Sequence, residues 1–299
     1  RGDWLSHIGV AREIQMITGN KASLPRTRIK ESTTLTKNLA TIRILDKQKC
    51  RRYSARLLKN VKLGPSPQWM QDRLQSVGLR PINNIVDVTN YVLMETGQPL
   101  HAFDYDTLAG HAIVVKCARE GEKFTTLDGK EHMLKADTLM ICDGEKPVAI
   151  AGVMGGANTE ISEGTTTVLI ESANFDPSSA RRTSKYLGLT TDASQRFERG
   201  VDIEMTLYAA NRAAQLIQEF TGAEVLKGSI DVYPKKARPS FVSLRVKRTN
   251  KVLGTSLSKQ EIISLLRRLE LIPAAQTKET VKFRVPSFRY DIVEEIDLI

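Results

Sequence analysis

Residues 80–106 of the chain read RPINNIVDVTNYVLMETGQPLHAFDYD. The stretch is dense in hydrogen-bonding side chains, namely Thr89, Asn90, Gln98, His101 and Asp104. The pattern predicts one short helix and the loop after it, and an ordinary core helix has little use for so many such groups. Two later segments are candidates to complete a site: AGVMGG at 151–156 and LTTDAS at 189–194. Together they predict a pocket for a small polar ligand, assembled from three distant pieces of sequence.

The length of 299 residues allows a sizeable core and predicts two domains plus a fragment. No apolar run approaches the roughly 20 residues of a membrane helix, so no association with a membrane is expected. The chain begins at Arg1 and ends inside the pattern DIVEEIDLI, which favours an excised piece of a longer protein. Three distant cysteines, Cys50, Cys117 and Cys142, form no CxxC pair, so reduced cytosolic thiols are expected instead of zinc ligands or disulfides.

The net charge of +10 and the pI near 9.5 are set partly by a basic segment between Arg26 and Lys62. Its cations include Lys47, Lys49, Arg51, Arg52 and Arg56. Two interpretations remain open for this segment: a solvated strand face, or a surface that faces nucleic-acid phosphates.

Helical spacing, alternation and turn residues predict a mixed succession of elements. The predicted helices are at 3–18, 66–78, 84–97, 176–188, 202–222 and from 258 onward. The predicted strands are at 40–45, 53–61, 113–115, 138–141, 148–150, 168–170, shortly after 240, and 281–285. We expect Asp3 to cap the first helix and Ser66 the second, and we expect 20–38 and 233–240 to be linkers. The fold class is α+β: a mixed strand/helix central domain flanked by a partial N-terminal domain and a small α+β domain.

Common catalytic devices are missing from the sequence. There is no GxSxG nucleophile elbow, and the glycines at 152–156 lack the lysine and Ser/Thr of a phosphate-binding loop. These glycines therefore predict a tight turn where the backbone approaches a ligand closely. His7, His111 and His132 are interpreted as structural.

Four motifs resemble the editing domain of the bacterial phenylalanyl-tRNA synthetase beta subunit. They are RPINNIVDVTNYVLMETGQPLHAFD, GVMGG, IESANFDP and TTDASQRFERGVD, and their order and spacing also match. The flanks RGDWLSHIGVAREIQMITG, FVSLRVKRTNKVLG and VPSFRYDIVEEIDLI resemble the neighbouring domains of that family. The resemblance implies three parts: residues 1–36, the end of an N-terminal domain and a linker; 37–234, the tRNA-editing domain; and 235–299, a small α+β domain, nucleic-acid-binding-like and incomplete at its C-terminal end.

The resemblance implies that this region hydrolyses mischarged Tyr-tRNA(Phe). A hydrophobic pocket rejects an isostere with an added hydroxyl by only about a hundredfold, so a second, hydrolytic site is needed. Glu171 matches the acceptor of the tyrosyl hydroxyl, although the residue alone suggests a strand-end carboxylate facing water. The remaining matches are Thr191 and Ala193, which shape the pocket; Gly155, a close-approach glycine; and Thr89, Asn90 and His101, which we expect to orient the water and the ribose.

The resemblance also implies cofactors and partners. Asp291 and Asp297 match the first two ligands of Mg²⁺, and the other ligands fall beyond Ile299. ATP would be used by the whole enzyme and not bound by this fragment. The implied partners are tRNA(Phe) and the alpha subunit, in a cytoplasmic alpha2beta2 ligase whose aminoacylation site lies on that subunit. The alternatives are a non-catalytic nucleic-acid-binding or scaffolding module and a freestanding editing factor.

Overall fold

A computed structural model describes residues 1–299, which divide into two compact units. The larger unit comprises Arg26–Lys235 together with Gly2. The smaller unit combines Arg1 and Asp3–Pro25 with Lys236–Ile299. Each unit mixes helices and strands, so the predicted α+β class is confirmed. None of the helices is both long and apolar enough to cross a bilayer.

A six-stranded sheet forms the centre of the larger unit. Its strands are β1 (Glu31–Leu35), β3 (Cys50–Lys59), β4 (Leu100–Asp104), β11 (Val168–Phe175), β12 (Glu224–Lys227) and β13 (Ile230–Val232). The order is β1-β12-β3-β11-β4, with β13 also paired to β3. Only the β1–β12 pair is parallel. All eight residues of β11 are buried because both faces of the sheet are covered.

A second sheet covers one face of the first. It is ordered β10-β9-β8-β5-β2. Its strands are β2 (Thr41–Ile44), β5 (Ala112–Cys117), β8 (Leu139–Cys142), β9 (Pro147–Ile150) and β10 (Met154–Gly155), and a small hairpin pairs β6 (Lys123–Thr125) with β7 (Glu131–Met133). Residues of the two sheets, such as Leu57 and Phe103 from the first and Ile113 and Ile141 from the second, share one core cluster. Leu169, Ala173 and Phe175 of β11 belong to this cluster, so the odd-numbered side chains of β11 face the second sheet.

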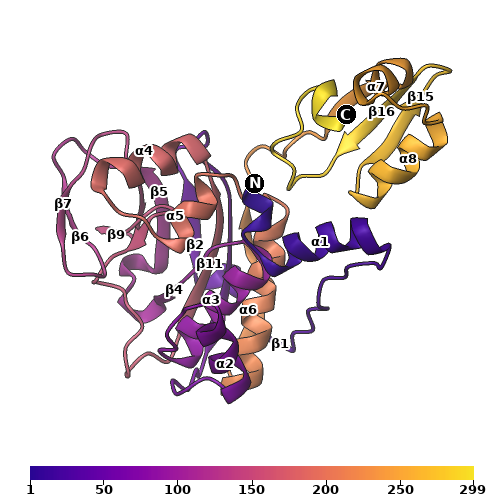
Figure 1. The fold of residues 1–299 in the computed structure, drawn as a ribbon. Coiled ribbons are helices and arrows are strands. Elements are labelled where there is room, and N and C mark those ends of the chain that lie inside the picture. The colour runs from indigo at the N-terminus through magenta and orange to yellow at the C-terminus, as the bar shows by residue number, and fades with distance from the viewer. The chain divides into compact units, whose positions relative to one another are not determined.

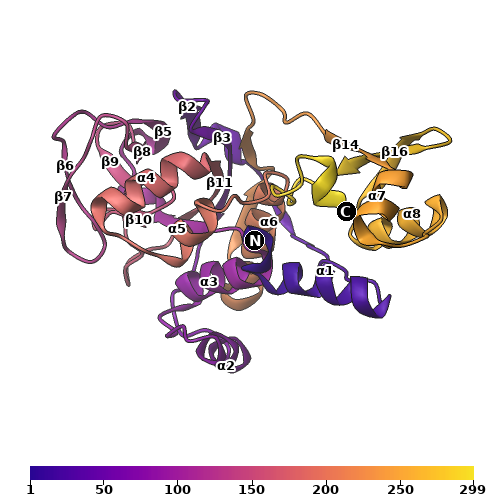
Figure 2. The same ribbon diagram turned by 45° about the horizontal axis from the view of Figure 1, so that its top comes forward.

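Helices cover the other face of the first sheet, as Figures 1 and 2 show. They are α2 (Gln68–Ser76), α3 (Asn84–Thr96) and α6 (Met205–Thr221), while α4 (Pro177–Leu187) and α5 (Asp192–Phe197) follow β11. Val88 and Val92 of α3 and Ala209 and Ala213 of α6 share a cluster with Ile170 of the sheet. The small alanine side chains allow α6 to approach α3 and the sheet closely.

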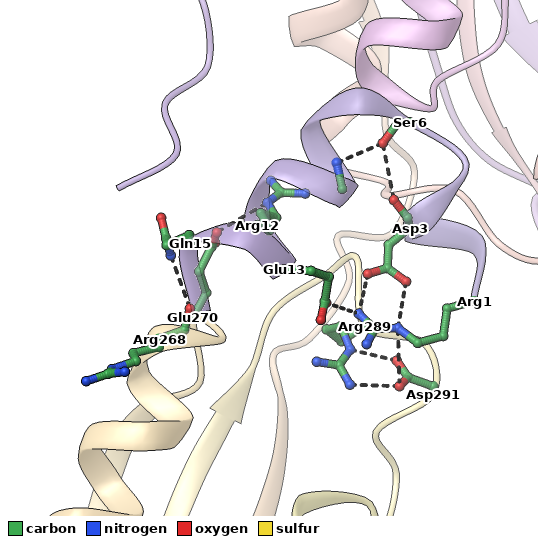
Figure 3. A network of polar contacts seen from close by, with 11 residues as sticks. Arg1, Asp3, Ser6, Arg12, Glu13, Gln15, Arg268, Glu270, Arg289 and Asp291 are labelled. Atoms are coloured by element: carbon green, nitrogen blue, oxygen red, sulfur yellow. Dashed lines mark hydrogen bonds and ion pairs between the residues drawn. The ribbon is translucent and has the colours of Figure 1, made fainter. Parts of the chain in front are cut away.

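The smaller unit consists of three strands, three α-helices and two short helices, η1 (apart from Gly2) and η5. Its elements are η1 (Gly2–Trp4), α1 (His7–Thr18), β14 (Ser240–Arg245), α7 (Val246–Leu253), α8 (Lys259–Arg268), β15 (Ile272–Gln276), β16 (Thr280–Val285) and η5 (Glu295–Leu298). The sheet order is β14-β16-β15. Figure 3 shows how α1 joins the C-terminal part: Gln15 donates to the Arg268 carbonyl at 3.1 Å and Arg12 pairs with Glu270 at 3.2 Å.

Several sequence-based expectations of local structure are wrong. Ser6, not Asp3, caps α1, and the Ser66 hydroxyl donates to Asp87 instead of capping α2. The expected linker 20–38 contains β1, and the loop expected after α3 contains β4. The helix α7 was not predicted at all. Eight of the sixteen strands were not predicted; two of them, β1 and β4, are short and are stabilised by pairing with strands far away in sequence, β12 and β11.

Candidate functional site

Glu171 lies in the middle of β11 and is only 5% exposed. Its neighbours across the sheet are Ala55 of β3 and His101 of β4. The interpretation of Glu171 as a strand-end carboxylate facing water is therefore wrong. Residues directly opposite each other in antiparallel strands project from the same face, so Glu171 and His101 share the face that the second sheet covers.

One oxygen of the Glu171 carboxylate has a partner from the protein itself. The hydroxyl of Tyr53 donates to Oε2 at 2.7 Å, whereas Oε1 accepts no hydrogen bond from the chain. Burial raises the pKa of Glu171 to about 7, and the bond from Tyr53 acts in the opposite direction. The carboxylate is thus held in a low-dielectric environment with one oxygen available to a ligand.

His101 is half-buried, and its imidazole forms no hydrogen bond with the rest of the chain. Its Nε2 atom has no hydrogen-bond partner and no contact with solvent. Burial lowers the pKa of His101 to about 4, so the ring is neutral near pH 7. The ring also packs edge-on against Phe103, with centroids 4.5 Å apart. Burying a nitrogen without a hydrogen-bond partner costs free energy of folding, so Nε2 is a candidate to bind a water or a ligand.

The glycine turn approaches the ring of His101 closely. A Cβ on Gly155 would lie 2.6 Å from Cε1 of His101 and 3.0 Å from Cδ1 of Leu127. Gly152 has a φ of 71°, which favours glycine, and a Cβ there would meet Phe197 at 3.0 Å. The turn therefore needs glycine at 155 for space and at 152 for backbone conformation.

The N-terminus of α5 is tied to this turn. The hydroxyl of Thr191 donates to the Val153 carbonyl at 2.8 Å, and it also accepts from the Ser194 amide at 3.0 Å in a reciprocal capping box. Ala193, the second residue of α5, packs against the core between the two sheets. Thr191, Ala193, Gly155, His101 and Glu171 therefore come from four separate segments that the fold connects.

Thr89 and Asn90 are placed differently. Both lie on α3, whose apolar residues pack on the opposite face of the first sheet. The Thr89 hydroxyl donates to the Val86 carbonyl at 2.7 Å, and neither residue hydrogen-bonds with His101 or Glu171. Asn90 lies one turn before Met94, to which Arg196 of α5 donates at 3.2 Å, so it shares the helix edge nearest α5.

The two candidate metal ligands have other partners. Arg289 donates to both oxygens of Asp291 at 2.8 Å, and this pairing lowers the pKa of Asp291 (Figure 3). Asp297 accepts from the amides of Val293 and Glu294, and these bonds lower its pKa. In residues 1–299 no three His, Cys, Asp or Glu side chains form a metal-binding group. The carboxylates present do not fit a magnesium site on their own.

Two cations of the basic segment are buried ion-pair partners. Arg52 donates to both oxygens of Asp231 at 2.9 Å, and Arg56 contacts Glu31 at 2.6 Å. Arg52 and Arg56 therefore belong neither to a solvated strand face nor to a surface that faces nucleic-acid phosphates. Lys47 and Arg51 are exposed, although Arg51 pairs with Asp176.

Tyr53 is the residue of this site that the sequence did not indicate. The run from Tyr53 to Val61 predicts a strand, but no local signal shows that its first side chain meets Glu171, which is 118 positions later. The register of β3 against β11 alone creates this contact.

Comparison with known proteins agrees with this architecture. The family model of the B3/4 domain matches residues 49–222, and that of the tRNA synthetase B5 domain matches residues 242–299. The phenylalanine–tRNA ligase beta subunit of Syntrophus aciditrophicus is 51% identical over the whole chain. The chain belongs to the phenylalanine–tRNA ligase beta-subunit family.

Other members of the phenylalanine–tRNA ligase beta-subunit family match equally completely. The beta subunits of Moorella thermoacetica and Geobacter metallireducens are each 49% identical over 100% of this chain. The chain spans 37–38% of the length of these three relatives. A solved N-terminal fragment of the beta subunit from Pyrococcus horikoshii is 18% identical over 100% of this chain and 82% of that chain, with a TM-score of 0.45.

Proposed function

We propose that the larger unit hydrolyses the ester bond of mischarged Tyr-tRNA(Phe). The observation that carries the proposal is the direct pairing of Glu171 with His101 across β11 and β4, against the glycine turn at Gly155. One of these groups can accept a phenolic hydroxyl, and the other can hold a water. An esterase that selects tyrosine needs both in one place.

Glu171 provides the selectivity in this proposal. Its carboxylate already accepts one phenolic hydroxyl, from Tyr53, and its Oε1 atom is available for another. A phenylalanyl ester would cover that oxygen without offering a donor, and a buried acceptor left unpaired costs about 1–3 kcal/mol. The phenylalanyl ester therefore binds weakly and is not hydrolysed, whereas the tyrosyl ester is bound and hydrolysed.

His101 positions the water instead of transferring a proton in an ion-pair mechanism. Its pKa of about 4 keeps the ring neutral at physiological pH, so Nε2 can accept a hydrogen bond from a water next to the ester. Because an aminoacyl ester is already activated, positioning and polarisation supply the acceleration. Thr89 and Asn90 would orient the ribose, and Thr191, Ala193 and Gly155 would form the walls of the amino-acid pocket.

The rest of the proposed function belongs to the whole enzyme. With an alpha subunit, in an alpha2beta2 complex, it would charge tRNA(Phe) with phenylalanine at the expense of ATP. Mg²⁺ binding would need carboxylates beyond Asp291 and Asp297, so no step of the editing reaction is assigned to the metal.

The test compares deacylation of Tyr-tRNA(Phe) and Phe-tRNA(Phe) by the two-subunit enzyme. Glu171→Ala is expected to lower the preference for the tyrosyl ester about tenfold to a hundredfold. The control is Glu224→Ala, which removes an exposed carboxylate from β12 of the same sheet. Equal preference in Glu171→Ala and wild type would contradict the proposal. Tight binding of Tyr-tRNA(Phe) without turnover would instead favour a nucleic-acid-binding module.

A further inference from the structure

A second tyrosine-like group is built into the candidate site. Tyr53 is completely buried between the two sheets, and its hydroxyl donates to Oε2 of Glu171 at 2.7 Å. The contact is diagonal, because Tyr53 pairs with Ala173 and Glu171 pairs with Ala55 across the same two strands. The protein thus places a phenol of its own on the carboxylate expected to bind the phenol of the substrate.

The contact restricts the carboxylate in two ways. A buried phenol must have an acceptor, so Tyr53 fixes the plane and rotamer of Glu171 through Oε2. The bond also leaves Oε1 as the one carboxylate oxygen without a partner in the chain. No other side chain donates to this carboxylate.

We propose that Tyr53 is a positioning residue for tyrosine selectivity: it holds Glu171 through Oε2 so that Oε1 meets the hydroxyl of a tyrosyl ester. The inference rests on the proposed editing function and deepens it. Tyr53 itself does not touch the reacting ester and is not a catalytic residue.

Tyr53 also influences the charge of Glu171. The titratable groups that interact with Glu171 are Tyr53 and Cys50 on β3, and His101 is its partner on β4. Burial raises the pKa of Glu171 to about 7, and donation by Tyr53 is the influence that lowers it. Without this donor, Glu171 would be protonated over more of the neutral range. A neutral carboxyl group binds a phenol more weakly and is less costly to leave unpaired, so selectivity would fall.

The experiment uses the two-subunit enzyme with Tyr53→Phe, which removes one oxygen and keeps the ring. The ratio of kcat/KM for Tyr-tRNA(Phe) and Phe-tRNA(Phe) is measured between about pH 6 and pH 8.5, after subtraction of spontaneous hydrolysis. We expect the ratio to fall about tenfold near pH 7 and to recover partly at higher pH, because the pKa of Glu171 rises further when the donor is lost. A purely structural defect would not move the pH midpoint.

The matched control is Tyr105→Phe. Tyr105 is a buried phenol of the same core cluster whose hydroxyl donates to the Leu39 carbonyl and not to Glu171. This variant is expected to keep the wild-type ratio and midpoint. If Tyr53→Phe fails to fold, 3-fluorotyrosine at position 53 replaces it. This stronger donor should shift the midpoint to lower pH.

The outcomes separate the inference from the proposed function. If the wild-type enzyme is selective and Tyr53→Phe has the same ratio and the same pH midpoint, the role of Tyr53 is overturned and editing is left intact. An unchanged midpoint in the fluorotyrosine protein has the same meaning. Absence of tyrosine release by the wild-type enzyme overturns both. A lowered ratio with a raised midpoint supports both.

Discussion

Glu171 and His101 are cross-strand neighbours whose pKa values burial shifts in opposite directions. The pKa of Glu171 rises from 4.5 to about 7, so the folded state binds more protons than the unfolded chain between these values. Stability from this group therefore falls as the pH rises through that range. The pKa of His101 falls from 6.5 to about 4, so its contribution falls as the pH drops through that range. The two dependences largely cancel in the wild-type protein.

Glu171→Gln should separate the contribution of the carboxylate to the pH dependence of stability from that of His101. The amide does not titrate, so the variant lacks the loss of about 3 kcal/mol that ionisation of Glu171 alone causes between pH 4.5 and pH 8, while the opposing contribution of His101 remains. The unfolding free energy of the variant minus that of the wild type should be about 3 kcal/mol larger at pH 8 than at pH 4.5. Urea unfolding at both pH values measures it. Glu224→Gln, at an exposed site, should change by less than about 0.5 kcal/mol at either pH.

Gly155→Ala should damage the site directly. The new Cβ would lie 2.6 Å from the His101 ring, so ring or turn must move, at a cost of about 1–3 kcal/mol. Deacylation should be lost with it. Gly64→Ala is the control, because a Cβ there meets nothing within 4 Å. Thermal unfolding and Tyr-tRNA deacylation are measured for both variants, and Gly64→Ala should match the wild type in both. A Gly155→Ala protein as active as the wild type would show that the close approach is unimportant.

At the scale of elements, α5 depends on one threonine. Thr191 both caps this six-residue helix and holds the Val153 carbonyl of the glycine turn. Thr191→Ala removes both bonds and should cost about 1–2 kcal/mol, with weaker binding of the tyrosyl ester. Thr191→Ser keeps the hydroxyl and should recover most of the stability in the same urea titration. A serine variant as unstable as the alanine variant would mean that packing of the methyl group, not capping, is decisive.

Elements with local signals were predictable from the sequence, whereas elements defined by pairing were not. The ends of α1, α3, α4 and α6 were predicted from Gly19, Gly97, Gly188 and Gly222, each of which has a positive φ. In contrast, LHAFD at 100–104 contains no β-branched residue to signal a strand and forms β4 by pairing with β11.

The same distinction applies to the site. The motifs indicated Glu171, His101 and Gly155, and the structure brings these three together. Thr89 and Asn90 lie on α3 and form no bond to Glu171 or His101, so their expected role in orienting the water and the ribose stays a prediction. Tyr53 could not be foreseen, since only the long-range register of β3 on β11 places its hydroxyl on the carboxylate.

At the scale of the molecule, the two units have separate cores. Three hydrophobic clusters lie within 26–235, and the fourth uses only residues from 242 onward. Residues 234–240 are exposed and include Lys235 and Lys236. Limited trypsin treatment should therefore cut first after these lysines, since Pro239 protects Arg238.

The fragment ending at residue 235 or 236 should retain cooperative thermal unfolding, as followed by circular dichroism. Serine at both lysines should slow the first cut without changing the unfolding of the chain. Early cleavage inside the larger unit would contradict the division into two separately folded cores.

The pairing of α1 with the C-terminal part has a consequence for synthesis on the ribosome. Gln15 and Arg268, which are in contact, are 253 positions apart, and residues 26–235 of the larger unit are translated between them. Residues 3–25 therefore emerge before residues 26–235 and wait for strands β14 to β16, while the larger unit already has all of its residues and can fold. Its folding replaces a long flexible loop with a compact body and so reduces the entropy lost when α1 docks. Although α1 is translated before nearly all of the larger unit, it thus reaches these native contacts only after that unit has been made.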